Sequence, residues 1–161
     1  MFSLPGYELR LGSRRDRPLL AQFMRRTYQE LGNVQTAAHL DATIEQHFSA
    51  ETPLWWLYPT LPETNSLAQV QPVGCLWLGN AVDPLSGDRH AYVLLLYIDP
   101  NYRRQGLGTA LMQQAIAWSQ ARGDRQIGLQ VFCQNQAAVR LYEKLGFSSQ
   151  ALWMTKGVSD S

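Results

Sequence analysis

The segment with the clearest chemical potential runs from Tyr97 to Thr109 and reads YIDPNYRRQGLGT. Gly106 and Gly108 let a backbone approach a ligand closely and adopt conformations that side chains disfavour. A helix that begins near Gly106 has unpaired N–H groups and a positive dipole end at its start, and both favour an anion. Arg103 and Arg104 add guanidinium groups that suit phosphate oxygens. These residues predict a phosphate or pyrophosphate site that follows a strand.

Two other phosphate-binding motifs do not fit this segment. A P-loop requires Gly-Lys-Ser/Thr, and the lysines of the chain, Lys144 and Lys156, are far from the turn. The dinucleotide fingerprint requires a third glycine three residues after the second, where this chain has Leu111. The residues alone therefore leave either an anion site of another kind or a tight strand-to-helix turn with solvated arginines.

Two motifs in the second half of the chain resemble those of one family. RRQGLG at 103–108 matches the signature Arg/Gln-x-x-Gly-x-Gly/Ala, and NQAAVRLYEKLGF at 135–147 matches Asn-x-x-Ala-x-x-Leu-Tyr-x-x-x-Gly-Phe. With both motifs in this order and a strand expected between them, the chain resembles the GNAT acyl-CoA-dependent N-acetyltransferase superfamily. The close resemblance covers about residues 92–150, whereas the first 90 residues agree only in the order of their elements.

The resemblance implies that acetyl-CoA is the cosubstrate and that its acetyl group passes directly to a primary amine. Strands at 91–98 and 126–132 are then expected to diverge and to hold the pantetheine arm, with the backbone of Leu96 and Ile98 as its partners. The pyrophosphate is expected on backbone N–H groups from about 104 to 109. The coenzyme-binding residues that this implies are Leu96, Tyr97, Ile98, Arg103, Arg104, Gln105, Gly106, Leu107, Gly108, Thr109 and Asn135.

We expect individual roles for four residues. Arg103, the first residue of the signature, is expected to contact phosphate or the adenosine end. Tyr142 matches the tyrosine whose hydroxyl faces the thioester sulfur, where a phenol would protonate or hydrogen-bond the departing thiolate; a packed aromatic ring is the alternative. Asn135 matches a residue that binds the arm or an ordered water, and it also suits a helix N-cap. Asp99 is expected to shape the loop.

The group that removes a proton from the amine is not identified by the sequence. Several family members carry a glutamate on the fourth strand, near the position that aligns with Leu94, so that carboxylate is absent here. Backbone carbonyls and water are one replacement, because holding the reactants together already contributes much of the rate. A non-catalytic acyl-CoA-binding or regulatory module is the other interpretation. The side chains considered as a base are Glu51, His47, His39, His90 and Tyr92.

The net charge of +1 conceals three blocks along the chain. Residues 1–29 carry a net charge of +4, residues 30–99 carry −7, and residues 100–161 carry +4. A total near zero argues against non-specific nucleic-acid binding. The acidic middle block favours a cationic amine as acceptor, whereas the first basic block has no assigned role.

The resemblance places the acceptor pocket among residues 20–60, which are rich in aromatic rings. Rings and acids together would hold a cationic amine, and the alternative is that most of these rings form the core. Trp55 and Trp56 are neighbours on an expected strand, so their side chains point to opposite faces. One is expected in the core, and the other in a cleft, a dimer contact or the surface. The residues concerned are Tyr28, His39, His47, Phe48, Trp55, Trp56 and Tyr58.

The periodicity of apolar residues predicts a single mixed α/β (α+β, mixed-sheet) domain over residues 1–161, and the resemblance implies that this domain has the GNAT fold. The expected order is β-α-α-β-β-β-α-β-α-β. The expected strands are 7–11, 54–58, 73–78, 91–98, 126–132 and 147–154, and the expected helices are 17–31, 36–50, 107–123 and 138–145.

Composition and the remaining residue types limit the compartment and the partners. Cys75 and Cys133 are expected to be buried reduced thiols, and a metal site is not expected because no histidine lies near them. The longest apolar run, 91–98, is too short to cross a bilayer, and the N-terminus lacks the pattern of a signal peptide. We therefore expect a cytoplasmic protein without nucleic-acid or membrane partners. A homodimer fits the resemblance, but no pattern identifies an interface.

Overall fold

The computed structural model describes residues 2–32, 37–60 and 70–160. The chain forms two compact units, Met1–Gln130 and Val131–Ser161, which are described separately. Asn33 and Thr36, which were predicted to flank the link between the first two helices, lie outside the described residues. The prediction of a single domain over 1–161 stays a prediction.

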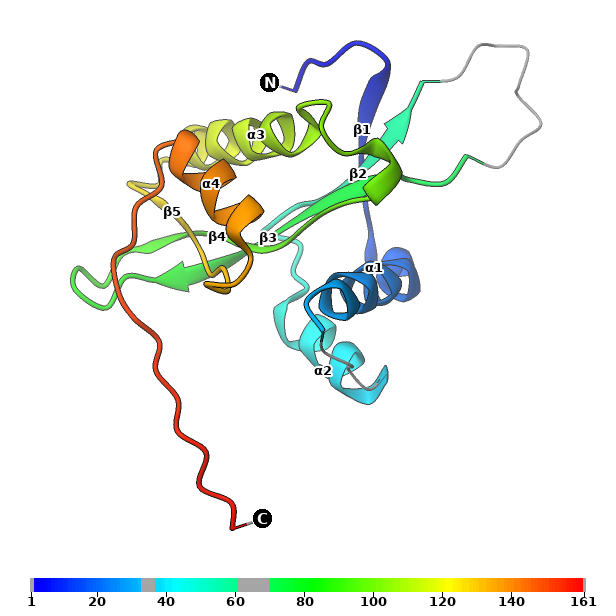
Figure 1. The fold of residues 1–161 in the computed structure, drawn as a ribbon. Coiled ribbons are helices and arrows are strands. Elements are labelled where there is room, and N and C mark those ends of the chain that lie inside the picture. Colours follow the sequence, from blue (N-terminus) through cyan, green and yellow to red (C-terminus); the bar gives the residue numbers. More distant parts are fainter. Residues whose placement is uncertain (1, 33–36, 61–69, 161) are drawn as a thin grey trace. The chain divides into compact units, whose positions relative to one another are not determined.

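The first unit is built on a five-stranded mixed sheet (Figure 1). Strands follow one another in the sheet in chain order, β1-β2-β3-β4-β5, with antiparallel pairing from β1 to β4 and parallel pairing between β4 and β5. This confirms the mixed α/β fold. The strands are β1 (Tyr7–Leu11), β2 (Leu54–Pro59), β3 (Gly74–Val82), β4 (Arg89–Ile98) and β5 (Ile127–Leu129).

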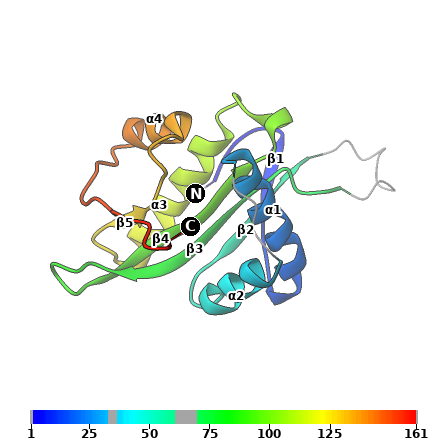
Figure 2. The same cartoon turned by 60° about the horizontal axis from the view of Figure 1, so that its bottom comes forward.

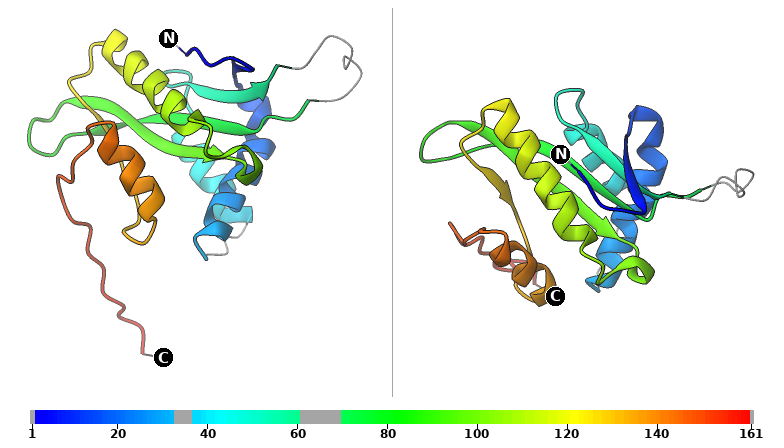
Figure 3. Two further views of the ribbon diagram at one scale, coloured as in Figure 1. Left: turned by 45° about the horizontal axis from the view of Figure 1, so that its top comes forward. Right: turned by 90° about the horizontal axis from the view of Figure 1, so that it is seen from above.

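Helices cover both faces of this sheet. In Figure 1 α3 lies above the sheet while α1 and α2 lie below it, and the views in Figures 2 and 3 agree. Pro18 stands in the first turn of α1, where its missing N–H costs nothing, and Gly123 ends α3 with a left-handed backbone. The helices are α1 (Arg17–Glu30), α2 (Ala37–His47) and α3 (Leu107–Arg122), with short 3-10 turns η1 (Arg14–Asp16) and η3 (Pro100–Tyr102).

The alternation of side chains along β2 explains why both tryptophans are buried. Trp56 joins a core cluster with Phe23 of α1 and Tyr97 of β4, and the Phe23 and Trp56 rings meet edge to face at 5.3 Å. Trp55 points to the opposite face and is also buried. Trp56 is thus the tryptophan expected in the core. Trp55, although largely buried, lines an open hollow with Leu9 and Gln114, as the cleft alternative expected. Most of the other rings that were considered for an acceptor pocket pack against the same cluster: Tyr28, Phe48 and Tyr58.

A bulge interrupts β4 at Leu94. Trp77 of β3 pairs with Leu95 and Leu78 pairs with Val93, so Leu94 has no partner across the ladder. An extra residue of this kind bends a strand and increases its twist. The parallel pairing of β4 with β5 runs from Ala91 to Val93 and stops where the bulge begins. The pairing stops there because β5 itself ends at Leu129, so the divergence of the two strands that the resemblance implied stays a prediction.

The other end of β4 is held by a buried carboxylate. Asp124, which follows α3, accepts a hydrogen bond from the backbone N–H of Ala91 at 2.7 Å and one from the Ser119 hydroxyl at 3.0 Å. Arg122 pairs with the same carboxylate at 2.7 Å and donates to the side chain of Asn80 on β3, also at 2.7 Å. These contacts tie the end of α3 to the start of β4.

The second unit consists of a short loop, the helix α4 (Gln136–Lys144) and a C-terminal segment. The strand predicted at 147–154 is wrong, because residues 147–160 form neither strand nor helix. A strand needs a partner edge for its backbone groups, and no strand among the described residues pairs with this segment. Its apolar side chains are accordingly exposed, at 74% for Trp153 and 84% for Leu152 and Met154.

The two cysteines differ in environment. Cys75 of β3 is fully buried and reduced, as predicted, and burial raises the pKa of its thiol well above the ordinary value. Cys133, in the loop before α4, is free but exposed. The expectation of a second buried thiol is wrong because β5 ends at Leu129, and the apolar run that follows it does not continue as a strand.

No helix within the described ranges combines the length and the apolar character that crossing a bilayer requires.

Candidate functional site

The turn between β4 and α3 begins with a carboxylate that shapes it. Asp99 is the N-cap of η3, and its side chain accepts a hydrogen bond from the backbone N–H of Asn101 at 2.9 Å. The backbone N–H of Asp99 in turn donates to the carbonyl of Val73 at 2.8 Å, which fixes the turn to the sheet. The prediction that Asp99 shapes the loop is confirmed.

Two residues of the turn have left-handed backbones. Arg104 has φ 65° and Gly106 has φ 80°, and Arg104 is the one residue other than glycine with a positive φ among those described. A β-carbon on Gly106 would meet no atom within 4 Å, so the space above this residue is open. Only the backbone conformation, rather than crowding, explains the preference for glycine here.

The start of α3 leaves backbone donors available. Gly106 is the N-cap of this helix and has no side chain to accept the first N–H groups, while its carbonyl accepts from Ala110 at 3.0 Å. The first N–H groups of a helix have no partner inside it. At the N-terminus of the 16-residue helix α3 they also carry its positive dipole end. An oxyanion in front of Gly106 would meet these groups without displacing a side chain.

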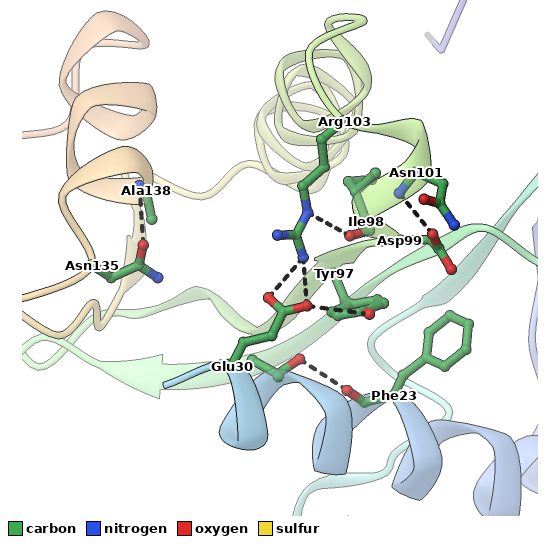
Figure 4. A network of polar contacts seen from close by, with 10 residues as sticks. Phe23, Glu30, Tyr97, Ile98, Asp99, Asn101, Arg103, Asn135 and Ala138 are labelled. Carbon is green, nitrogen blue, oxygen red and sulfur yellow. Dashed lines mark hydrogen bonds and ion pairs between the residues drawn. The ribbon is translucent and has the colours of Figure 1, made fainter. Parts of the chain in front are cut away.

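Arg103 faces the protein (Figure 4). Its Nε donates to the carbonyl oxygen of Ile98 at 2.8 Å, and its Nη2 donates to both carboxylate oxygens of Glu30 at 2.9 and 2.8 Å. The hydroxyl of Tyr97 lies 3.5 Å from the same carboxylate. Glu30 is the last residue of α1, so this group joins α1 to the end of β4. No sequence motif marks Glu30, which is recognisable in the sequence only as one acid of the block at residues 30–99.

Of the other two polar side chains of the turn, Gln105 binds the protein as Arg103 does, whereas Arg104 has no such partner among the described residues. Gln105 accepts a hydrogen bond from the hydroxyl of Tyr7 at 2.8 Å, which attaches the turn to β1 across 98 positions. Arg104 is exposed, and no carboxylate in the described parts of the chain pairs with it. Leu107 is buried under the turn, so only its backbone faces outward. Arg104 is therefore the cation of this turn that is available to a ligand.

The outer edge of β4 carries the backbone groups that the sequence analysis assigned to the pantetheine arm. Because the Asp99 N–H points to β3, the Ile98 carbonyl of the same peptide points away from it. By alternation the backbone groups of Leu96 face the same outer edge. The Ile98 carbonyl already accepts a hydrogen bond from Arg103. Of the two residues predicted to bind the pantetheine arm, Leu96 therefore has the backbone that is more available.

The second unit holds the two remaining predicted residues. Asn135 caps α4, since its side chain accepts a hydrogen bond from the Ala138 N–H at 3.4 Å, as the N-cap interpretation expected. Tyr142 is half-buried on α4, and its ring meets that of Phe147 at 5.9 Å. Burial raises the pKa of the Tyr142 phenol above its ordinary value, so this group stays protonated at neutral pH.

The side chains considered as a general base do not gather at one place in the first unit. His39 and His47 belong to α2, and Glu51 follows α2 in an exposed turn. His90 lies at the start of β4, where its Nδ1 is 2.8 Å from the Ala91 carbonyl, eight positions before Ile98. Burial raises the pKa of Tyr92, so less of this phenol is present at neutral pH as the phenolate that could accept a proton. The geometry singles out none of the five.

The three charge blocks neutralise one another in space. Glu45 of α2 pairs with Arg14 at 3.2 Å and with Arg17 at 2.9 Å, and both arginines come from the first basic block. Glu30 pairs with Arg103 of the third block. Arg125 of the third block pairs with Asp88 at 3.2 Å. Three acids of the middle block are thus paired with arginines of the other two blocks, and the preference for a cationic acceptor stays a prediction.

The donor set of the turn fits a polyanionic coenzyme and not a metal ion. The available groups are the N–H donors at the start of α3 and the guanidinium of Arg104, and all of them suit phosphate oxygens. In the part of the chain that the structure describes, no group of three or more histidine, cysteine or acidic side chains is placed to hold a metal ion.

Comparison with known proteins decides the family. The sequence profile described as "Acetyltransferase (GNAT) family" matches residues 20–147. The chain belongs to the acetyltransferase (GNAT) family. The RRQGLG turn and the NQAAVRLYEKLGF segment, which carried the resemblance, both lie inside the matched range.

Curated relatives match this GNAT chain over part of its length. An uncharacterized N-acetyltransferase of Methanocaldococcus jannaschii is 33% identical over 85 residues, which are 50% of this chain and 36% of that protein. The [ribosomal protein bS18]-alanine N-acetyltransferase of Escherichia coli K12 is 44% identical over 55 residues, covering 34% and 37% of the two chains. The human N-alpha-acetyltransferase 30 is 40% identical over 60 residues, covering 37% and 16%. The matches thus span little more than a third of these relatives at most.

Solved structures share the GNAT fold along most of the chain. A predicted acetyltransferase from Clostridium acetobutylicum, determined with acetyl-CoA, has a TM-score of 0.71 at 18% identity and covers 94% of this chain and 96% of that one. A putative acetyl transferase from Pyrococcus furiosus has a TM-score of 0.65 at 23% identity, with coverage of 94% and 99%. At such identities the likeness concerns the fold.

Proposed function

We propose that this protein transfers the acetyl group of acetyl-CoA to a primary amine by direct attack, without a covalent enzyme intermediate. The observation that carries the proposal is the start of α3, where Gly106 leaves the first N–H groups of the helix uncapped behind an open surface. That site suits a pyrophosphate, and the chain belongs to a family of acetyltransferases. Acetyl-CoA would supply a thioester whose thiolate leaves when the amine attacks.

The residues of the turn have separate roles in this proposal. The backbone N–H groups from 104 to 109 bind the pyrophosphate, and the exposed Arg104 adds a cation. The backbone of Leu96 on the outer edge of β4 hydrogen-bonds the pantetheine amides. Tyr142 protonates or hydrogen-bonds the departing thiolate, and its raised pKa keeps a proton available for that purpose. Asn135 hydrogen-bonds the arm or a water beside it.

Removal of the amine proton is assigned to water and backbone carbonyls. Leu94 occupies the bulge of β4, near the position where several family members carry a glutamate, so no carboxylate is supplied there. Alignment of amine and thioester contributes to the rate without a dedicated base. The same absence favours a second candidate, a non-catalytic acyl-CoA-binding module. The proposed compartment is the cytoplasm, and dimerisation is left open.

The acceptor class is proposed from the names of relatives. One is named a [ribosomal protein bS18]-alanine N-acetyltransferase and another an N-alpha-acetyltransferase. A free α-amino group on a peptide is therefore the first acceptor to examine. Such an amine deprotonates more readily than a lysine side chain, since its pKa is roughly 8 rather than about 10. This difference suits a site without a carboxylate base.

The experiment that tests the function measures thiol release from acetyl-CoA with a panel of amines, together with calorimetric binding of CoA. The panel contains peptides with free α-amino groups, the same peptides blocked at the N-terminus, lysine-containing peptides and polyamines. Turnover with an amine supports the enzyme, and mass spectrometry of the acetylated product identifies the amine. Binding of CoA without turnover across the panel supports the non-catalytic module, and failure to bind CoA contradicts both.

A further inference from the structure

We infer that Glu30 and Arg103 form a positioning pair that holds the coenzyme-binding turn against the end of α1, and that Arg103 is not itself a phosphate ligand. The inference rests on the proposed function, because it concerns how the same turn binds acetyl-CoA. It assigns a role to Glu30, a residue outside both family motifs, and it divides the Arg103-Arg104 pair into one arginine for the protein and one for the coenzyme.

The hydrogen bonds of Arg103 all go to groups of the protein itself that the structure describes. A guanidinium group has five N–H donors on three nitrogens in one plane, and two of these nitrogens are engaged: Nε with the Ile98 carbonyl and Nη2 with both carboxylate oxygens of Glu30. The side chain thus connects the strand that precedes the turn with the helix on the sheet's lower face in Figure 1. An arginine that swung out to a phosphate would leave the Glu30 carboxylate and the Ile98 carbonyl without this donor.

Glu30 stands at a position where a helix alone would not favour a carboxylate. It is the last residue of α1, where the negative end of the helix dipole disfavours a carboxylate. The ion pair with Arg103 at 2.8 Å offsets this unfavourable position. The Tyr97 hydroxyl, 3.5 Å away, lies beside the same carboxylate, and the Tyr97 ring is fixed by Phe23 of α1 at 5.3 Å. The carboxylate therefore has a defined orientation toward the turn (Figure 4).

The turn is attached on a second side as well. Gln105 accepts from Tyr7 of β1, so the residues on both sides of Arg104 are bound to the protein through their side chains. Arg104 between them has the left-handed φ of 65° and remains exposed. Fixing the flanks holds the backbone N–H groups in place before the coenzyme arrives, and such preorganisation reduces the entropy lost on binding.

Glu30→Gln distinguishes the two possible roles of Arg103, because a phosphate ligand and a positioning residue predict opposite changes in CoA affinity. If Arg103 were a phosphate ligand, Glu30 would compete with the pyrophosphate for it, and Glu30→Gln would tighten CoA binding. If the pair positions the turn, Glu30→Gln loosens the turn and weakens CoA binding, by roughly three- to tenfold for one charge-assisted contact. The matched control is Glu45→Gln, which breaks exposed ion pairs with Arg14 and Arg17 and should leave CoA affinity unchanged.

The measurement is calorimetric titration of CoA into the full-length wild type and the variants, with thermal unfolding recorded alongside. We expect Glu30→Gln and Arg103→Lys to weaken binding to a similar extent, because lysine keeps the charge but lacks the fork, and to raise the KM for acetyl-CoA more than they lower kcat. The double variant should bind no more weakly than either single one. Equal or tighter binding by Glu30→Gln overturns the inference, whereas a wild type that binds no CoA overturns the proposed function instead.

Discussion

The side chain of Leu94 lies directly over Gly79 of the neighbouring strand. A β-carbon added to Gly79 would stand 2.7 Å from Leu94 Cδ1 and 3.1 Å from its Cγ, closer than real β-carbons approach such atoms. The glycine on β3 therefore provides the space into which the bulge of β4 turns its extra side chain. The parallel ladder with β5 ends one residue before the bulge, at Val93, which pairs with the last residue of β5, Leu129.

The first prediction concerns this contact. Gly79→Ala should displace Leu94 and lower the free energy of unfolding by about 1–3 kcal/mol, the cost of overpacking a core site. Chemical denaturation measures the loss, and the KM for acetyl-CoA should rise as the bulge shifts. In the Leu94→Ala background the same glycine substitution should change stability and KM little, since the smaller side chain removes the clash. A loss in that background as large as in the wild type would mean that the bulge does not depend on this pair.

The bulge also shows where prediction from sequence stops. The apolar run that became β4 was identified from its residues, because a strand that is buried on both faces is apolar throughout. Nothing in Leu94-Leu95-Leu96 shows that the first leucine is left out of the ladder, since a register shift depends on the partner strand. The divergence of the strands was predicted only through the family resemblance, and it stays a prediction.

The second prediction tests the turn backbone. Gly106→Ala places a side chain at φ 80°, which costs about 1–2 kcal/mol. The turn can relieve this strain by moving its N–H groups away from the coenzyme, so the KM for acetyl-CoA should rise roughly tenfold. Gly123→Ala is the matched control, because Gly123 has φ 93° at the other end of the same helix and equally open surroundings. It should lose similar stability without a change in KM.

The third prediction concerns pH and Asp124. The hydrogen bonds from Arg122, followed by those from Ala91 and Ser119, lower the pKa of this carboxyl from 3.8 to about 2 despite its burial. A lowered pKa contributes stability above the unfolded-state value that is lost as the pH falls toward 2, here roughly 2 kcal/mol. Denaturation at pH 2–7 should show this loss in the wild type. Asp124→Asn should be less stable at pH 7 and lack that component of the acid loss.

The control for this experiment is Asp88→Asn, which removes an exposed ion pair with Arg125. Exposed pairs contribute little, so its stability should follow the wild type at every pH. If Asp124→Asn behaves like this control, the carboxylate does not hold the end of α3 to β4.

Charge pairing illustrates a second limit of the sequence. The block pattern was read correctly as a cancellation, but its interpretation as an acidic approach assumed that residues adjacent in sequence share a face. In the structure Glu45 meets Arg14 and Arg17, which come from a different block, because α1 and α2 lie side by side (Figure 2). Such contacts depend on helix packing, which the one-dimensional charge pattern does not contain. The turn at 103–109, by contrast, is local in sequence and was found from its residues.

The fourth prediction tests Arg104 as the cation that meets the coenzyme. Arg104→Gln should raise the KM for acetyl-CoA and make it less dependent on ionic strength, because one screened charge pair is lost. Initial rates at a series of salt concentrations measure both effects. Arg15→Gln is the control, since Arg15 is equally exposed but lies on η1, outside the turn. A salt dependence that is identical in Arg104→Gln and the wild type would remove Arg104 from the site.

The last prediction concerns Tyr142 as the proton donor to the thiolate. Tyr142→Phe keeps the ring and its contact with Phe147 at 5.9 Å but removes the hydroxyl. We expect kcat to fall about a hundredfold, the usual size of a general-acid contribution, with little change in CoA affinity or in thermal stability. Burial raises the phenol's pKa above its ordinary value, so loss of this proton should not lower the wild-type kcat at neutral or mildly alkaline pH. An unchanged kcat in Tyr142→Phe, measured by thiol release with the amine identified from the panel, would show that the thiolate leaves without this hydroxyl and that Tyr142 serves only to pack α4.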